Sequence, residues 1–239
     1  MGERVDLRWG QRLYDAAILL ILLPLLAPVG LLVAAAVFVD SPGSVLYRAR
    51  RIGAGGRAFE MLKFRTMKSG SVGPGLTRAN DERFTPVGSF LARTRLDELP
   101  QLWNVLRGEM RLVGPRPEDP DFVALHRTKY GEILTVPPGI TGITQLTHFQ
   151  DALDAEDPHG DYERILPGKL ALDISYVRSR NLAGDLLIVA RTLLLPLRLA
   201  TAGLRVVVDA HRPAAPHLSV GATSLLLMVA LLTISGPAR

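Results

Sequence analysis

Cysteine is absent from the 239 residues of the chain. A disulfide framework, a thiolate metal site and a cysteine nucleophile are therefore excluded. The sequence also lacks an internal repeat and a long low-complexity run, which argues against a repeat array. Because the chain is too short for two ordinary globular domains joined by a linker, we expect one folded domain together with membrane segments.

Acidic residues are outnumbered, since 23 Asp and Glu face 28 Lys and Arg, giving a net charge of +5. This balance suits a nucleic acid, an anionic lipid or a phosphate-rich substrate. Nucleic acid is not expected as a partner, because the basic residues gather around carboxylates and no stacking platform of aromatic residues accompanies them. A basic membrane adaptor without enzymatic activity remains an alternative.

Charged residues are missing from residues 16–39, which form an apolar run. About 20 such residues are enough for a membrane helix, whereas the apolar region of a signal peptide is about 7 to 15 residues long. Pro24 and Pro28 lie inside the run, so we expect a kink or break, above all at Ala27-Pro28. Arginines flank both ends, so the positive-inside rule favours neither end for crossing. The pattern predicts a re-entrant helix with both ends on the cytoplasmic face, and a kinked single span is the alternative.

A second apolar stretch lies at residues 225–234 in the predicted C-terminal tail, 201–239. It is short for a full membrane span, which needs about 20 residues. We therefore treat it as a candidate apolar anchor only.

Two short strands are predicted at residues 45–47 and 59–64, joined across the glycine-rich residues 53–56. The glycines do not follow a phosphate-loop spacing, so a hairpin turn is the better interpretation. Lys63 and Arg65 are two positions apart and share one face of a strand. We therefore expect them to bind phosphate.

Asp97 and Glu98 are the candidate catalytic residues. Leucines and Trp103 recur between residues 96 and 106 at the spacing of one helix face, so Trp103 and Leu106 are expected to pack on an apolar partner. Proline is best tolerated in the first helical turn, so Pro100 predicts that the two carboxylates lie at or just before the helix start. An isolated pair there is most simply a helix cap with a surface neighbour.

Basic residues change that interpretation. Arg93 and Arg95 precede the pair, Arg116 follows between two prolines, and Lys63 and Arg65 lie upstream. Carboxylates among guanidinium groups suit phosphoryl chemistry, because they can hold a divalent ion or attack phosphorus while the cations neutralise phosphate oxygens. Adjacent residues differ by about 100° around a helix, so the two carboxylates should have different roles.

Four further residues are candidates for a substrate pocket. Gly139 and Gln145 belong to a proline- and glycine-rich loop that can bring the backbone close to a ligand. Asp173 and Tyr176 lie on the next predicted helix. The expected fold is thus α+β and mainly helical, with a small β-hairpin and a membrane helix.

Taken in order, these motifs resemble the bacterial sugar transferase family, the monotopic phosphoglycosyl transferases. The resemblance covers residues 10–200 and rests on the proline-broken helix and four motifs: Lys63-Phe64-Arg65-Thr66-Met67, Leu96-Asp97-Glu98-Leu99-Pro100-Gln101-Leu102, Gly114-Pro115-Arg116-Pro117 and Pro138-Gly139-Ile140-Thr141-Gly142. Two positions differ from what is common in the family: Ala27 stands where serine often precedes the proline, and Ile143-Thr144 stands where Trp-Ala is common.

The resemblance implies a re-entrant membrane helix (residues 1–40) and a catalytic domain (41–200) on the cytoplasmic face of the bacterial inner membrane. It implies a Mg²⁺-dependent transfer of sugar-1-phosphate from a UDP-sugar to undecaprenyl phosphate. By position, Asp97 would attack the sugar-linked phosphate and Glu98 would help to bind Mg²⁺. Lys63, Arg65, Arg93 and Arg116 would hold phosphates. A membrane-bound nucleotide-sugar hydrolase is an alternative, and a homodimer is left open.

Overall fold

The structure is a computed structural model that describes residues 3–73, 81–147 and 158–194. The chain divides into two compact units, Met1–Val189 and Ala190–Arg239. The helices and strands that position the candidate site all belong to the first unit. The predicted apolar anchor at residues 225–234 lies outside the described residues.

Helices dominate the described chain, as predicted. The long α1 spans Glu3–Asp40. The other helices, with two short 3-10 turns labelled η, are η1 (Ala54–Gly56), α2 (Pro86–Thr94), η2 (Leu96–Glu98), α3 (Gln101–Leu106), α4 (Pro120–Leu125), α5 (Arg127–Ile133), α6 (Ile143–Thr147) and α8 (Pro158–Ser179). A further helix covers residues 182–194.

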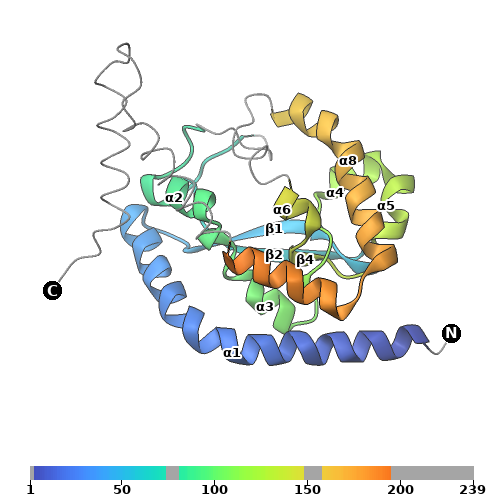
Figure 1. The fold of residues 1–239 in the computed structure, drawn as a ribbon. Helices are drawn as coiled ribbons and strands as arrows, with labels where there is room; N and C mark the ends of the chain where they lie inside the picture. Colours follow the sequence, from blue (N-terminus) through green and yellow to red (C-terminus); the bar gives the residue numbers. More distant parts are fainter. Residues whose placement is uncertain (1–2, 74–80, 148–157, 195–239) are drawn as a thin grey trace, which may run out of the picture. The chain divides into compact units, whose positions relative to one another are not determined.

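Helix α1 continues through Pro24 and Pro28. Figure 1 shows that it bends between its two ends. Proline explains a bend of this kind, because it removes a backbone donor and its ring obstructs the carbonyl four residues earlier. Among the described helices, Gly10–Asp40 is the one long and apolar enough to cross a membrane, with a mean hydropathy of 2.8 and 11% burial in its most apolar stretch. The core helix of a soluble protein would be mostly buried.

The predicted hairpin is confirmed. Strands β1 (Leu46–Ile52) and β2 (Ala58–Phe64) are antiparallel, with Tyr47 opposite Lys63 and Ile52 opposite Ala58. The connecting residues form η1, in which Gly55 has a φ of 67°, a conformation that glycine adopts without a steric cost.

A second, parallel pair joins β3 (Arg111–Val113) to β4 (Gly139–Thr141). At Gly139 the two backbone segments come so close that a Cβ atom on this residue would lie 2.0 Å from the backbone nitrogen of Gly114. The glycines therefore bring the loop that follows β3, which carries Arg116, against the Pro-Gly-Ile-Thr segment.

The inner side of α1 belongs to the apolar core. Leu19 packs with Met61 of the hairpin and with Met110 beside β3. Farther along, Val33 packs with Leu91 of α2. Each fully buried side chain of this size contributes about 1.5–3 kcal/mol through the hydrophobic effect, so these contacts fix α1 on the folded domain.

A charged side chain strengthens the same attachment. Arg111 of β3 donates from Nη1 to Gln11 Oε1 at 2.8 Å and from Nη2 to the Gln11 carbonyl at 3.0 Å. Its Nε also pairs with Asp15. Helix α1 is thus tied to the strand that leads into the Arg116 loop.

Candidate active site

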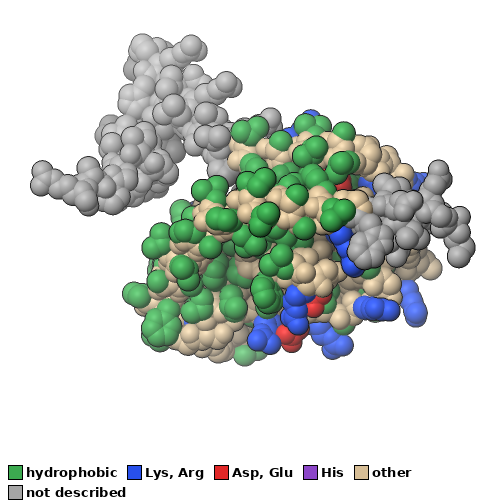
Figure 2. All heavy atoms as spheres, turned by 90° about the horizontal axis from the view of Figure 1, so that it is seen from below, with side chains coloured by type: hydrophobic (Ala, Val, Ile, Leu, Met, Phe, Trp, Pro, Cys, Tyr) green, Lys and Arg blue, Asp and Glu red, His purple; other side chains and the backbone are tan. Residues whose placement is uncertain are grey.

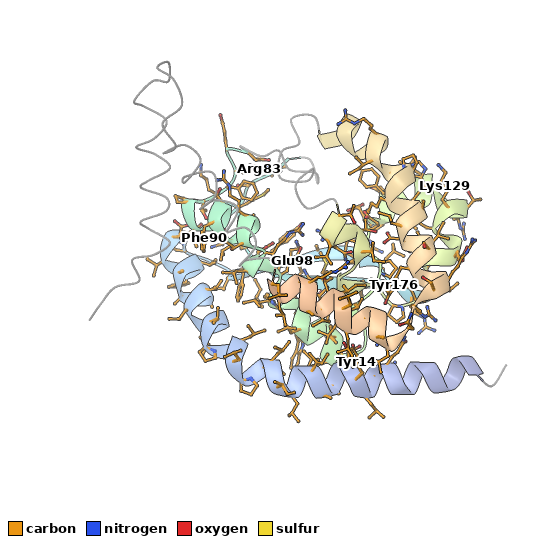
Figure 3. The ribbon with its side chains drawn as sticks, in the orientation of Figure 1. Tyr14, Arg83, Phe90, Glu98, Lys129 and Tyr176 are labelled. Carbon is orange, nitrogen blue, oxygen red and sulfur yellow. The ribbon has the colours of Figure 1, made fainter. Side chains whose placement is uncertain are left out.

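Asp97 and Glu98 lie on η2, the short turn that links α2 to α3 and contacts both α2 and β2. Their side chains are buried, with 6% and 7% exposure. Pro100 is the N-cap residue of α3, which begins at Gln101, so the carboxylates precede that helix by about one turn and Asp97 does not cap it. Figure 3 shows Glu98 deep among side chains from several elements.

Lys63 links the two carboxylates. It projects from β2, and its Nζ donates to Glu98 Oε1 at 3.1 Å and to Asp97 Oδ2 at 3.4 Å. The predicted strand-borne cation is therefore beside both candidate catalytic residues.

Two arginines complete the cationic group around Glu98. The Nη1 atoms of Arg95 and Arg116 donate to Glu98 Oε1 at 3.0 Å and 3.5 Å. The side chains of Lys63, Arg95 and Arg116 keep 18%, 27% and 33% of their surface exposed. These cations can therefore reach an anion arriving from solvent while they hold the buried carboxylate.

The environment separates the two acids. Burial raises the pKa of Asp97, an effect that Lys63 opposes and the Glu98 charge reinforces. Burial also acts to raise the pKa of Glu98, but Lys63, Arg116 and Arg95 together outweigh it and hold that pKa below its usual range. Glu98 is the more firmly ionised carboxylate and Asp97 the more basic one.

One carboxylate oxygen of Asp97, Oδ1, called its open oxygen below, is buried but has no hydrogen-bond partner in the described chain. Buried polar atoms are nearly always hydrogen-bonded, so an exception at a charged cluster indicates a place for a ligand.

The donor set fits Mg²⁺ that shares its ligands with a substrate. No group of three or more His, Asp or Glu side chains placed to hold a metal occurs within residues 3–73, 81–147 and 158–194. Mg²⁺ commonly uses only one or two carboxylates and takes its other ligands from phosphates and water. Asp97 and the neighbouring Glu98 provide such a pair.

Arg65 and Arg93 lie apart from this group. Arg65 donates from Nη2 to the carbonyl of Ser41, just beyond α1. Arg93 is exposed in the last turn of α2, and no hydrogen bond or ion pair joins it to either carboxylate. The structure thus brings Lys63 and Arg116 to the carboxylates, while the phosphate-binding roles of all four residues stay predictions.

Gly139 and Gln145, two of the candidate pocket residues, are near each other. Gln145 Nε2 donates to the Gly139 carbonyl at 3.4 Å. Gln145 Oε1 is buried without a hydrogen-bond partner in the described chain. The absence of a side chain at Gly139 lets the backbone of Gly114 lie close to it, so in this structure the space beside Gly139 is taken by Gly114.

Asp173 and Tyr176 make contacts that hold helices together. Asp173 accepts a hydrogen bond from Thr144 of α6. The Tyr176 hydroxyl donates to Asp185 at 2.9 Å, and burial raises the pKa of Tyr176 with Asp185 adding to the effect. Their roles toward substrate stay predictions.

A second buried charged group, the Lys169 group, lies close enough to Arg116 for the two to interact electrostatically. It consists of Lys169 of α8, its ion-pair partner Glu118, and Asp173. Burial together with Arg116 and Arg51 lowers the pKa of Lys169 to about 7, and Asp173 acts in the opposite direction. Because the Glu118 carbonyl also accepts from Ile52 N at 3.0 Å, the loop carrying Arg116 is pinned just beyond that arginine.

Sequence reasoning placed Arg95 among the arginines near the carboxylates without making it a site residue, and it assigned no role to Asn104. Asn104 is fully buried; its Oδ1 accepts from Leu62 N at 3.0 Å and its Nδ2 donates to the Glu60 carbonyl at 2.8 Å. It thereby fixes the strand of Lys63 against α3. A polar residue within a leucine-rich helix pattern was the available signal for Asn104, and position beside the carboxylates was the signal for Arg95.

The predicted apolar face of α3 is only partly correct. Trp103 and Leu106 are 56% and 49% exposed, whereas Gln101 is 2% exposed. The reason is that α3 is a helix of six residues whose inner side meets a strand edge, where Asn104 supplies the hydrogen bonds that the edge needs.

A buried carboxylate pair bounded by partly exposed cations, in a mainly helical domain with one long apolar helix, defines an enzyme site suited to phosphate-bearing substrates. The family model for bacterial sugar transferases matches residues 7–198. The chain belongs to the bacterial sugar transferase family and is a phosphoglycosyl transferase, as the sequence predicted.

Several relatives are similar to this chain over about three quarters of its length. A UDP-glucose:undecaprenyl-phosphate glucose-1-phosphate transferase of Caulobacter vibrioides is 38% identical over 193 residues, 79% of this chain and 69% of the relative. A protein of the same name from Xanthomonas campestris is 40% identical over 75% of this chain, which spans only 37% of that relative. The exopolysaccharide production protein ExoY of Sinorhizobium fredii is 36% identical over 77% of this chain and 83% of its own length.

Proposed function

We propose that the chain transfers a sugar-1-phosphate from a UDP-sugar to undecaprenyl phosphate and releases UMP, as the first membrane step of exopolysaccharide or related glycan assembly. One observation carries the proposal: the open oxygen of Asp97 lies in a buried site whose three cations remain partly exposed. The names of the Caulobacter and Xanthomonas relatives support the choice of donor and acceptor.

Asp97 is the proposed nucleophile. One of its carboxylate oxygens attacks the phosphorus bonded to the sugar, the bond from that phosphorus to the bridging oxygen breaks, and UMP leaves with the electron pair. The sugar phosphate then remains on Asp97 as an acyl phosphate. An oxygen of undecaprenyl phosphate attacks the same phosphorus in the second step and restores the free carboxylate.

The cations make the attack of an anion on a diphosphate feasible. Lys63 and Arg116 neutralise phosphate oxygens, and their placement in a largely buried site makes this electrostatic stabilisation stronger than in water. Arg65 and Arg93 would act farther out, on the donor or acceptor phosphates.

Asp97 and Glu98 are the residues that would hold Mg²⁺. When bound, the ion would neutralise charge on the diphosphate and polarise it toward attack. Glu98 is held ionised by its cations, which keeps a negative charge available for a metal at neutral pH.

The exposed apolar surface of α1 supports insertion of this helix into the cytoplasmic leaflet of the inner membrane. Its most exposed large apolar residues are Leu13, Leu20, Ile21, Leu25, Leu31, Leu32 and Val39, each at least 69% exposed. Figure 2 shows a face rich in hydrophobic side chains, with Lys and Arg gathered along one edge. Apolar groups bordered by cations suit the boundary between acyl chains and headgroups. A re-entrant α1 would hold the active site at the cytoplasmic surface, where a soluble donor and a lipid acceptor can use it in turn.

The absence of cysteine allows a direct test of this topology. Single substitutions Gly2→Cys and Ser44→Cys would flank α1. We expect both thiols to react with a membrane-impermeant reagent only after the cytoplasmic side is opened. Labelling of one thiol from outside would indicate a single span.

The reaction is tested with the purified chain, undecaprenyl phosphate and a panel of UDP-sugars. We expect UMP and a diphosphate-linked lipid sugar from at least one donor. Free sugar phosphate released without lipid would indicate the hydrolase, and no UMP from any donor, with intact membrane binding, would favour the adaptor.

A further inference from the structure

Arg95 is the one non-glycine residue of the described chain whose backbone is in the left-handed conformation. Its φ and ψ are 59° and 14°, and no other non-glycine residue within residues 3–73, 81–147 and 158–194 has a positive φ. This left-handed conformation costs a residue with a Cβ atom about 1–2 kcal/mol. Such strain is typical of functional sites, where surrounding structure maintains it.

The backbone turn alone does not require arginine. Arg95 ends α2 and begins η2, and its carbonyl accepts from Glu98 N at 3.1 Å. Glycine or asparagine adopts this conformation more readily. An arginine here therefore indicates a use for its side chain.

The Arg95 side chain contacts Glu98, the same residue whose backbone N–H binds the Arg95 carbonyl. Arg95 Nη1 donates to Glu98 Oε1 at 3.0 Å, the shortest of the three cation contacts to this oxygen. The main chain and the side chain of Arg95 thus both fix Glu98.

Lys63 is the cation that this arrangement affects. Its Nζ lies 3.1 Å from Glu98 Oε1 and 3.4 Å from Asp97 Oδ2, so the two carboxylates compete for one ammonium group. Because Arg95 also donates to Glu98, it reduces the electrostatic attraction between the Glu98 carboxylate and Lys63.

We propose that Arg95 is a positioning residue: it anchors Glu98 so that Lys63 stays shared with Asp97, whose open oxygen is then held toward the reacting phosphorus. The inference rests on the proposed function for its catalytic meaning. Its structural content, the sharing of Lys63, is independent of the reaction.

The test compares Arg95→Asn, Arg95→Gly and Arg95→Lys with Arg107→Asn as a matched control. Arg107 is an exposed arginine at the end of α3 whose nearest acidic partner, Glu109, is 4.0 Å away. Asparagine and glycine keep the backbone turn without the cation, and lysine keeps a cation.

We expect Arg95→Asn and Arg95→Gly to unfold at or above the temperature of the unmodified chain, because the backbone is relaxed. Their kcat for UMP release should fall about 10- to 100-fold with little change in KM for the donor, as for loss of one charged contact to a catalytic group. Arg95→Lys should recover a substantial part of kcat, and Arg107→Asn should match the unmodified chain. An Asn variant with full kcat would overturn the proposal, as would parallel losses of stability and activity that lysine does not restore.

A second measurement does not depend on turnover. Reductive methylation of Lys63, followed by mass spectrometry, should be slower in Arg95→Asn than in the unmodified chain, because Lys63 then pairs more tightly with Glu98. Equal labelling rates would overturn the inference even if the reaction is confirmed. Slower labelling in a chain that releases no UMP would instead uphold the contact and reject the proposed reaction.

Discussion

Two buried charged groups meet at Arg116, and they differ in what they leave accessible. Around Asp97 and Glu98, the three cations expose 18–33% of their side chains and one carboxylate oxygen has no partner in the described chain. In the Lys169 group, the side chains of Lys169 and Glu118 expose 5% and 10%. Arg116 contacts Glu98 of the first group and acts electrostatically on Lys169 of the second.

The comparison teaches that charge alone does not identify a site. An anionic substrate can approach the first group because its cations reach solvent. The Lys169 group is closed, and its effect is to hold the loop that presents Arg116. Substitutions in the first group should therefore alter chemistry, and those in the second should alter stability first.

Asp97→Asn should have the largest effect, a loss of UMP release of about 1,000-fold or more, because the nucleophile is removed. The unfolding temperature and membrane insertion should not fall. A donor labelled in the sugar phosphate, supplied without lipid acceptor, should label the unmodified chain but not the variant. Unchanged UMP release from Asp97→Asn would remove this residue from its role.

Lys169→Met should remove the buried ion pair of the Lys169 group and destabilise the fold. The change leaves Glu118 buried without its cation, which costs about 3–5 kcal/mol of unfolding free energy. Denaturant titration in detergent measures the loss. Combining the change with Glu118→Leu should restore much of the stability, and a single variant as stable as the unmodified chain would contradict the closed character of the group.

Glu98→Gln should test the metal role of the first group. We expect the rate to fall about 100-fold and the Mg²⁺ concentration for half-maximal rate to rise, because one negative ligand is lost. Glu60→Gln is the matched control, since Glu60 is an exposed acid paired only with Arg48 among the ion pairs of the described residues. An unaltered Mg²⁺ titration in Glu98→Gln would count against the ligand assignment.

Arg116→Ala and Arg93→Ala should give the smallest effects and rank the two predicted phosphate contacts. Loss of Arg116, which touches the carboxylate group, should lower kcat/KM by about 10- to 100-fold. Loss of exposed Arg93 should lower it by no more than about 3-fold. The reverse order would mean that phosphate binds on the outer side of α2.

Local patterns explain what the sequence could predict. The apolar run with two prolines, the glycine turn between two strand segments, and Pro100 beside the carboxylates all act within a few residues. They predicted α1, the hairpin and the position of Asp97 and Glu98 before α3.

Long-range contacts explain the rest. Arg111 reaches Gln11 across 100 positions of sequence, and Leu62 donates to Asn104 across 42. No local pattern encodes which of several arginines lies beside Glu98, so Arg93 and Arg95 could not be told apart. The exposure of Trp103 likewise follows from the partner that α3 meets, which the helix pattern does not specify.

The hydrogen bonds of Asn104 have a consequence for how this sequence can vary. They hold the strand of Lys63 against α3, the helix that follows Asp97 and Glu98. The two ends of the segment after β2 are also joined, since Thr85 N donates to the Thr66 carbonyl at 3.1 Å and Met67 pairs with Phe84 in a β-bridge. The number of residues between Met67 and Phe84 is therefore not what aligns the lysine with the acid. Insertions or an epitope tag between those two positions should leave the catalytic geometry intact, so relatives are free to differ in length there.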